Sequence, residues 1–163
     1  MTPVMAQDII RAGTLEDAAG IARLLHKIEG LGTIGSEAFE MTLARVRTQF
    51  STIINSQAHT LLVSAKNDII NAYISVHWHP TFLQADGEGF VSELFVIPEM
   101  RSQGIGTRLL ECIKNEAKKR GCARLSLLNM RHKASYERAY YQNLNWTERP
   151  NAANFILDLK GDS

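Results

Sequence analysis

The sequence is poor in cysteine and in charge of one sign. Its 163 residues include two cysteines, too few for a disulfide framework or a four-ligand zinc site. Eighteen Lys and Arg residues nearly balance 17 Asp and Glu residues, so neither the basic excess typical of nucleic-acid-binding proteins nor an acidic disordered tail is present. No apolar run approaches the roughly 18 residues that a membrane span requires. These absences leave an ordinary globular protein, with neither nucleic acid nor membrane expected as a partner.

The start of the chain also lacks the features of a signal peptide, since it has no basic segment and no apolar core before Ile10. We therefore expect a reduced, cytoplasmic protein. Protein domains average roughly 150 residues, so the length is that of one domain, and no Pro/Gly/Ser-rich linker divides the chain. A single domain over residues 1–163 is expected.

Hydrophobic periodicity predicts four helices and seven strands in the order βααβββαβαββ. Residues 69–78 alternate along a strand, while residues 89–98 are apolar on both faces, as in a central covered strand. This order predicts a mixed α/β (α+β) fold with helices on both faces of the sheet. The predicted helices are 15–28, 36–53, 105–120 and 135–144, and the predicted strands are 8–11, 60–65, 69–78, 89–98, 125–130, 146–149 and 154–159.

A glycine-rich turn at residues 101–107 separates the strand ending near Pro98 from the amphipathic helix that follows. Gly104 and Gly106 let the backbone approach a ligand closely, and the first amides of the helix carry the positive end of its dipole. Together they suit a phosphate or pyrophosphate. The dinucleotide-binding fingerprint needs a third glycine where Leu109 stands, and the P-loop needs a Gly-Lys-Ser/Thr that is absent. From this loop alone, a ligand site and a plain tight turn are equally compatible.

Two longer patterns carry a family resemblance. Glu93-Leu94-Phe95-Val96-Ile97-Pro98, followed by Arg101-x-x-Gly104-x-Gly106 and Leu109-Leu110, resembles the acyl-coenzyme A signature of the GNAT acyltransferase superfamily. Tyr141-Gln142-Asn143-Leu144-Asn145-Trp146 resembles that family's helix-to-strand ending, Tyr-x-x-Leu-Gly-Phe. The resemblance implies a mostly antiparallel sheet with splayed central strands, and an N-acetyltransferase that uses acetyl-CoA as co-substrate and no metal.

The resemblance also implies which residues hold the cofactor. The loop amides would receive the pyrophosphate, and the preceding strand would pair with the pantetheine arm. Ser135 would replace a frequent helix-initial asparagine, because Ala134 stands at that asparagine's position here. The implied cofactor-binding residues are Leu94, Phe95, Val96, Arg101, Ser102, Gln103, Gly104, Ile105, Gly106, Thr107 and Ser135.

Tyr141 and Glu93 are the implied catalytic pair. Tyr141 falls where the family often has a tyrosine that protonates the departing thiolate, which a phenol with an ordinary pKa near 10 can do. Glu93 is a carboxylate in an apolar strand, where burial would make it a stronger base for the acceptor amine, acting directly or through water. The structural alternatives are an aromatic ring that packs a helix end and a glutamate paired with an arginine.

The acceptor is not identified by the sequence beyond a small-molecule or peptide amine. A non-catalytic acyl-CoA sensor and a partner-binding module on the same scaffold stay open as other functions. Family members are often dimers, so a homodimer is possible here. His77 and His79 share a strand face, but no acid or cysteine nearby completes a metal site.

Overall fold

A five-stranded sheet with the strand order β1-β2-β3-β4-β5 is the centre of the first of two compact units in the chain. The computed structural model describes residues 8–83 and 85–159; the first unit ends at Leu128 and the second begins at Asn129. In the part of the chain so described, no helix combines the length and the apolar character needed to span a membrane. The elements of the first unit are β1 (Ile9–Ala12), η1 (Leu15–Asp17), α1 (Ala18–His26), α2 (Phe39–Ile53), β2 (His59–Lys66), β3 (Ile69–His79), β4 (Glu88–Val96), η2 (Pro98–Met100), α3 (Ile105–Lys119) and β5 (Arg124–Leu127).

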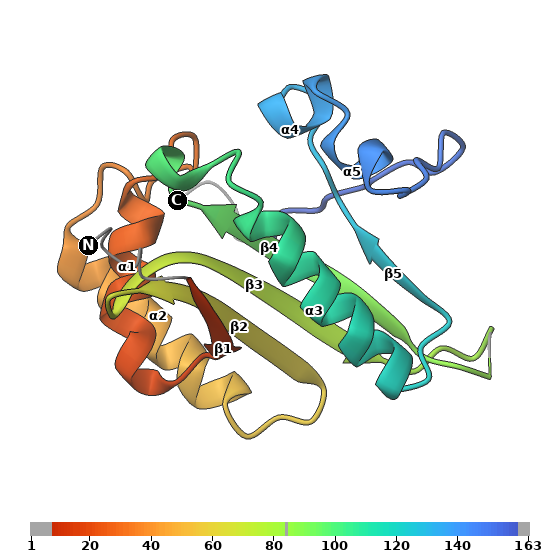
Figure 1. The fold of residues 1–163 in the computed structure, drawn as a ribbon, viewed down its shortest axis with the longest axis horizontal. Coiled ribbons are helices and arrows are strands. Elements are labelled where there is room, and N and C mark those ends of the chain that lie inside the picture. The colour runs from red at the N-terminus through yellow and green to blue at the C-terminus, as the bar shows by residue number, and fades with distance from the viewer. Residues whose placement is uncertain (1–7, 84, 160–163) are drawn as a thin grey trace, which may run out of the picture. The chain divides into compact units, whose positions relative to one another are not determined.

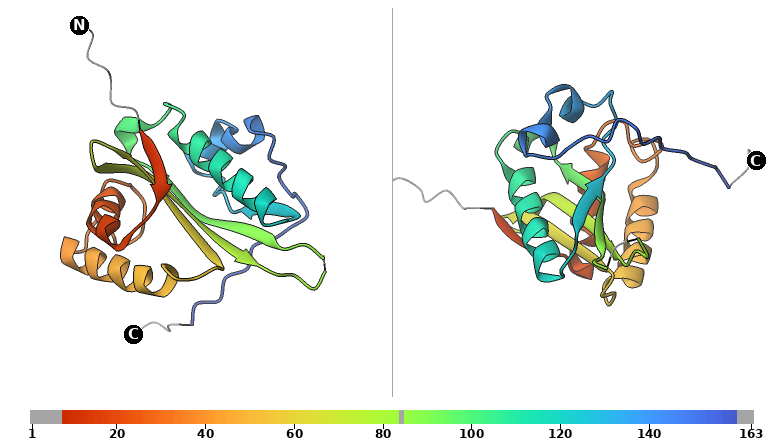
Figure 2. Two further views of the ribbon diagram at one scale, coloured as in Figure 1. Left: turned by 60° about the horizontal axis from the view of Figure 1, so that its bottom comes forward. Right: turned by 90° about the vertical axis from the view of Figure 1, so that its right-hand side faces the viewer.

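The sheet of this unit lies between two helical layers, as Figures 1 and 2 show. Helices α1 and α2 cover one face, and α3 covers the other (Figure 2, left). Successive strands pair antiparallel from β1 to β4, while β4 and β5 run parallel. The predicted mixed, mostly antiparallel α/β class is therefore confirmed.

Strand β3 is buried on both faces, although its sequence alternates between apolar and polar residues. Every residue from Ile70 to Val76 is buried, including Asn71, Tyr73 and Ser75. The alternation predicted two different faces correctly, but both are covered because helices pack on each side. Polar groups in the middle of this strand therefore need partners inside the protein.

Strand β4 changes its pairing halfway along. On its β3 side, Glu93 pairs with Ser75 and Val91 with Val76, so Ser92 is an extra residue, a β-bulge. On its β5 side, pairing covers Glu88 to Val91 and stops there. From Ser92 to Val96 this strand is hydrogen-bonded to β3 alone, so its other edge is open within the first unit. The splayed strands implied by the family resemblance are present at this point.

The second unit differs from its sequence prediction. The single helix expected over 135–144 is two one-turn helices, α4 (Ala134–Glu137) and α5 (Tyr140–Asn143). They are separated by Ala139 in the left-handed conformation with φ of 53°, which no α-helix accommodates. No Gly or Pro marks this break in the sequence.

The two final strands expected at 146–149 and 154–159 are also wrong, since residues 146–159 contain no strand. An alternating pattern specifies which face of a strand is apolar, but a strand also needs a neighbour to pair with. Within the final segment, Phe155, Ile156 and Leu157 are 91%, 80% and 82% exposed. Their apolar character, the basis of the strand prediction, is therefore not used for packing here.

Candidate functional site

The glycine-rich turn forms the N-terminus of α3 as the sequence predicts. Gly104 is the N-cap in the left-handed conformation with φ of 77°, and a Cβ there would meet only the Arg108 side chain, 3.9 Å away. Ser102 also has a positive φ, 60°, which turns the chain sharply ahead of the helix. The first amides of a helix have no acceptor within it, so the start of α3 at Gly104, Ile105 and Gly106 suits an anion, as the sequence predicts.

The open edge of β4 lies directly before this turn in the chain. The Ile97 amide donates to the Asn71 carbonyl at 2.9 Å, which fixes the phase of the antiparallel ladder. Because alternate residues of such a ladder point to opposite sides, the backbone groups of Leu94 and Val96 point away from β3, towards the open edge. The backbone of Phe95, the third predicted pantetheine contact, points to β3 instead, opposite Tyr73.

Arg101 connects the loop to this edge. Its Nε donates to the Val96 carbonyl at 3.2 Å, while the side chain remains exposed. The Gln103 amide group donates to the Glu99 carbonyl at 3.2 Å, which braces the same turn. Both predicted loop residues therefore help to hold the loop in shape, and Arg101 links the loop to the strand edge.

Glu93 lies at the bulge and is not paired with an arginine. Its Oε2 accepts a hydrogen bond from the Tyr73 hydroxyl at 2.9 Å, and the Glu93 side chain is exposed. The expectation that Glu93 is buried is wrong, because its side chain is exposed. Its exposure instead leaves the carboxylate accessible to a substrate.

The bulge decides which face Glu93 occupies. Ser92 Oγ donates to Ser75 Oγ at 3.1 Å, and Glu93 pairs with the same Ser75, so two successive residues of β4 lie near one residue of β3. In a regular strand they would point to opposite faces. Sequence reasoning missed Tyr73, Ser75 and Ser92 as neighbours of Glu93. The signal for the first two was their position on the polar face of the alternating strand.

Tyr141, in the second unit, is held by a helix-ending motif. The Trp146 amide donates to the Tyr141 carbonyl and the Asn145 amide to the Gln142 carbonyl, both at 3.0 Å, the pattern of a Schellman cap. Asn145 has a φ of 64°, so asparagine serves where the family pattern has glycine. The Tyr141 and Trp146 rings pack edge to face with centroids 5.9 Å apart. Tyr141 therefore does pack the end of a helix, which is the structural role given above as the alternative.

The acidity of Tyr141 differs from the expected value. Burial, and to a smaller extent the neighbouring Tyr140, raises the pKa of Tyr141 to about 12, against the lowering effect of Arg138. The hydroxyl therefore stays protonated at any physiological pH and is available only as a donor. Ser135, the predicted substitute contact, donates its hydroxyl to Asn129 Oδ1 at 2.9 Å within the same unit.

The histidines of the first unit form a pair different from the one in the sequence motif. His77 packs edge to face against His59 of β2, with ring centroids 4.6 Å apart, and His59 Nε2 lies 2.9 Å from Ser75 Oγ. Burial, and then the nearby His77, lowers the pKa of His59 to about 4, so its ring is neutral at pH 7. Over residues 8–83 and 85–159, no three His, Cys, Asp or Glu side chains come together as a metal-ligand set.

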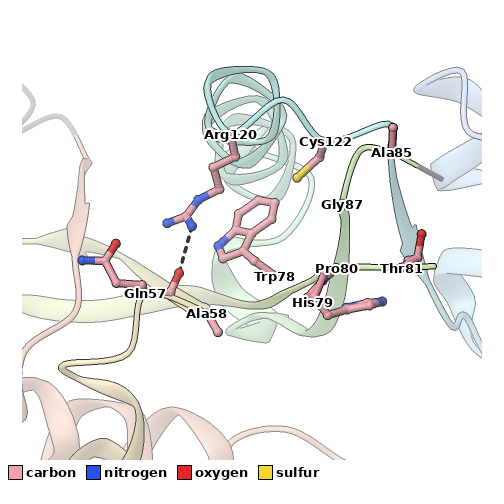
Figure 3. Close-up of a pocket in the computed structure, with 10 residues that line it drawn as sticks. All are labelled: Gln57, Ala58, Trp78, His79, Pro80, Thr81, Ala85, Gly87, Arg120 and Cys122. Atoms are coloured by element: carbon pink, nitrogen blue, oxygen red, sulfur yellow. Dashed lines mark hydrogen bonds between the residues drawn. The ribbon is translucent and has the colours of Figure 1, made fainter. Parts of the chain in front are cut away.

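A pocket of about 360 Å³ opens elsewhere in this unit, beside the C-terminal end of α3 (Figure 3). The Arg120 guanidinium lies over the Trp78 ring, 4.8 Å from its centroid, and donates to the Gln57 carbonyl at 2.9 Å. The glycine-rich turn is at the other end of the 15-residue α3, about 22 Å along the helix axis. This pocket is therefore separate from the predicted site, and its arginine is already engaged by the protein.

Comparisons with known proteins agree with this geometry. The family model described as "Acetyltransferase (GNAT) family" matches residues 29–146. Three solved structures share the fold at 20% sequence identity or less. A transcriptional regulator from Bacillus halodurans C-125 has a TM-score of 0.80 at 20% identity, covering 94% of this chain and 100% of its own.

The other two structures are acetyltransferases. Glucosamine-6-phosphate N-acetyltransferase from Arabidopsis thaliana has a TM-score of 0.71 at 18% identity, covering 93% of this chain and 99% of its own. An aminoglycoside N-acetyltransferase, AAC(6')-Iy, solved in complex with CoA, has a TM-score of 0.75 at 12% identity, covering 96% and 99%. No curated protein sequence matches the chain significantly. The structural similarity at these identities establishes the fold, and the family model establishes the lineage.

Proposed function

The chain belongs to the GNAT family of acetyltransferases, and on that basis we propose that it transfers the acetyl group of acetyl-CoA to a primary amine. The amine attacks the thioester directly, in a complex that holds both substrates. The observation that carries this proposal is the open edge of β4, where the backbone groups of Leu94 and the amide of Val96 face no strand of the first unit, directly before the glycine-rich turn. The Val96 carbonyl accepts the hydrogen bond from Arg101.

The cofactor fits this surface by shape and by charge. A pantetheine arm carries amide groups that pair with a strand edge, and a pyrophosphate suits the amides that begin α3. The net charge of the whole chain is only +1, so a polyanionic cofactor is bound by this local arrangement and not by a general basic field. The solved relative that contains CoA supports the choice of ligand.

Glu93 is the proposed base. An amine is mostly protonated at neutral pH and must lose a proton before it can attack. Glu93 lies exposed beside the open edge, so it takes this proton directly or through a water molecule.

Tyr141 is the proposed donor to the departing sulfur. A thiol has a pKa near 8.5, and with its own pKa raised to about 12 the Tyr141 phenol is a weaker acid than the thiol it would create. We therefore expect Tyr141 to act mainly through a hydrogen bond to the developing thiolate, with the proton completing its transfer from solvent. This differs from full proton donation by a phenol of ordinary pKa.

The amine is assigned only by class. Two of the acetyltransferases among the similar solved structures are named for amine-bearing sugars, glucosamine 6-phosphate and aminoglycosides. A panel of primary amines that includes amino sugars, polyamines and peptide N-termini, tested for release of the CoA thiol, identifies the acceptor.

Tyr141→Phe tests the catalytic assignment. It should lower kcat about 100-fold, the upper range for loss of one hydrogen bond to a charged group, and change KM for acetyl-CoA less than threefold. Tyr136→Phe is the matched control, since Tyr136 in the same unit donates its hydroxyl to Glu148 at 3.0 Å and has no proposed catalytic role. Unchanged turnover in Tyr141→Phe would remove Tyr141 from the mechanism. Calorimetric binding of acetyl-CoA without turnover of any amine would favour a sensor over an enzyme.

A further inference from the structure

Tyr73 is a core residue whose hydroxyl reaches the proposed base. It lies in the middle of β3 with 2% of its surface exposed, in the cluster of apolar side chains under α1 and α2. Its ring packs against the Phe95 ring, with centroids 5.7 Å apart and planes tilted by 57°. The packing fixes the ring, and the ring in turn fixes the position of the hydroxyl at its end.

Among the residues that the structure describes, the Tyr73 hydroxyl has one hydrogen-bond partner, Glu93. Burial, and then the adjacent Glu93 carboxylate, raises the pKa of Tyr73 well above its usual value, so the hydroxyl is a donor throughout the working pH range. It donates to Oε2 of Glu93 at 2.9 Å, while Oε1 has no hydrogen-bond partner among the residues that the structure describes. One carboxylate oxygen is thus held by the core and the other is free for a substrate.

The backbone beside Glu93 is held independently. Ser92 Oγ donates to both Oγ and the carbonyl oxygen of Ser75, at 3.1 and 3.2 Å, on the strand that carries Tyr73. A glutamate side chain at a surface bulge would ordinarily sample several rotamers, and ordering it costs entropy. Here the bulge sets its direction and Tyr73 sets its rotamer.

We propose that Tyr73 is a positioning residue, which orients the Glu93 carboxylate towards the acceptor amine through this hydrogen bond. The inference rests on the proposed function, because it assigns to Tyr73 a role through the proposed base. A core tyrosine with no such role would affect stability and leave kcat alone.

Tyr73→Phe tests this, because it keeps the packed ring and removes only the hydroxyl. We expect kcat to fall about tenfold, the effect of losing a typical hydrogen bond to a charged group. The KM for acetyl-CoA should stay within twofold. A wild-type kcat in Tyr73→Phe would overturn the inference.

Thr60→Val is the matched control. Thr60 accepts a hydrogen bond from the buried Trp78 indole at 2.8 Å in the same sheet, so this variant also loses one internal hydrogen bond. It should lower the urea midpoint without lowering kcat. A fall in kcat equal to that of Tyr73→Phe would assign the effect to general loosening of the sheet and contradict a specific role for Tyr73.

Glu93→Gln separates the failure of this inference from the failure of the proposed function. If Glu93→Gln is fully active, the base assignment fails, and the role of Tyr73 fails with it. If Glu93→Gln is inactive and Tyr73→Phe is unchanged, only the role of Tyr73 fails. If both variants lose activity, adding Tyr73→Phe to Glu93→Gln should cause no further loss, because the two residues act through one interaction.

Discussion

The two halves of β4 have the same neighbour on one side and different neighbours on the other. From Glu88 to Val91 the strand pairs with both β3 and β5, and from Ser92 to Val96 it pairs with β3 alone. The first half, which we call the closed half, has its backbone groups used within the sheet. In the second half, which we call the open half, backbone groups remain available to a ligand.

The closed half is reinforced by a buried carboxylate. Glu88 accepts hydrogen bonds from Arg124 Nε at 2.7 Å and Ser126 Oγ at 2.6 Å, so it ties β4 to β5 at the start of their paired segment. The open half has an exposed carboxylate, Glu93, bonded to one core hydroxyl. The same residue type therefore serves stability in one half and is exposed for chemistry in the other, because of what surrounds it.

The largest effect is expected where the open half meets α3. Gly104→Asp places a negative charge at the amides proposed to bind pyrophosphate, in a backbone conformation with φ of 77°. Acetyl-CoA affinity should fall about 300-fold or more by calorimetry, since like charges at about 4 Å cost about 4 kcal/mol near a protein surface. Gly104→Asn is the control of equal shape without charge, and asparagine tolerates positive φ. Binding undiminished in Gly104→Asp would exclude the loop from the cofactor site.

A substitution in the closed half is expected to lower stability without lowering cofactor affinity. A Cβ at Gly89 would lie 2.4 Å from the Trp78 ring and 2.6 Å from a Leu125 methyl, so Gly89→Ala overpacks the sheet. The free energy of unfolding in urea should fall by about 3 kcal/mol. Gly35→Ala is the control, because nothing lies within 4 Å of a Cβ there. An equal loss of acetyl-CoA affinity in the folded protein would show that the two halves are not separable.

Glu88→Gln should produce a smaller and pH-dependent loss. Hydrogen bonding to Arg124, and then to Ser126, lowers the pKa of Glu88 below its ordinary value against the effect of burial. A carboxylate whose pKa is lower folded than unfolded stabilises at neutral pH, and this contribution disappears as the pH falls through the folded pKa. Glu88→Gln should therefore cost about 2 kcal/mol at pH 7, and the difference from wild type should shrink steadily below about pH 4.

The comparison variant for this experiment is Glu93→Gln, in the open half. Its carboxylate is exposed, so the free energy of unfolding should change by less than about 0.5 kcal/mol at any pH. Equal pH-dependent losses in Glu88→Gln and Glu93→Gln would contradict the distinction between the two halves.

The sequence predicts the first unit well because each element there carries a local signal. Gly121 follows the C-cap Arg120 of α3 with a φ of 70°, as glycine typically does after a helix, and the Gly104 turn begins α3 where expected. Strands β2 to β4 lie within two residues of their predicted boundaries. These signals are short-range, so a single chain displays them without reference to the rest of the fold.

The second unit was predicted less well because its structure depends on more than local pattern. Ala139 takes a conformation that alanine seldom adopts, and the apolar residues from Phe155 onward pair with nothing in the described chain. At the site, the neighbours Tyr73 and Glu93 are 20 residues apart in sequence, and their register follows from a bulge that no residue type announces. The family pattern identifies the loop and the catalytic candidates. The contact between Tyr73 and Glu93 is visible only in the structure.

The bulge at Ser92 gives β4 one more residue than β3 over the same length, so the two halves of the strand are out of step in their alternation. A substitution scan that assumes a uniform two-residue repeat would assign Glu93 to the wrong side of the sheet. Substitutions can therefore change the side-chain pattern of the open half while the pattern of the closed half stays the same. The extra serine therefore lets one strand contain both a half that is paired on two sides and a half that is paired on one side.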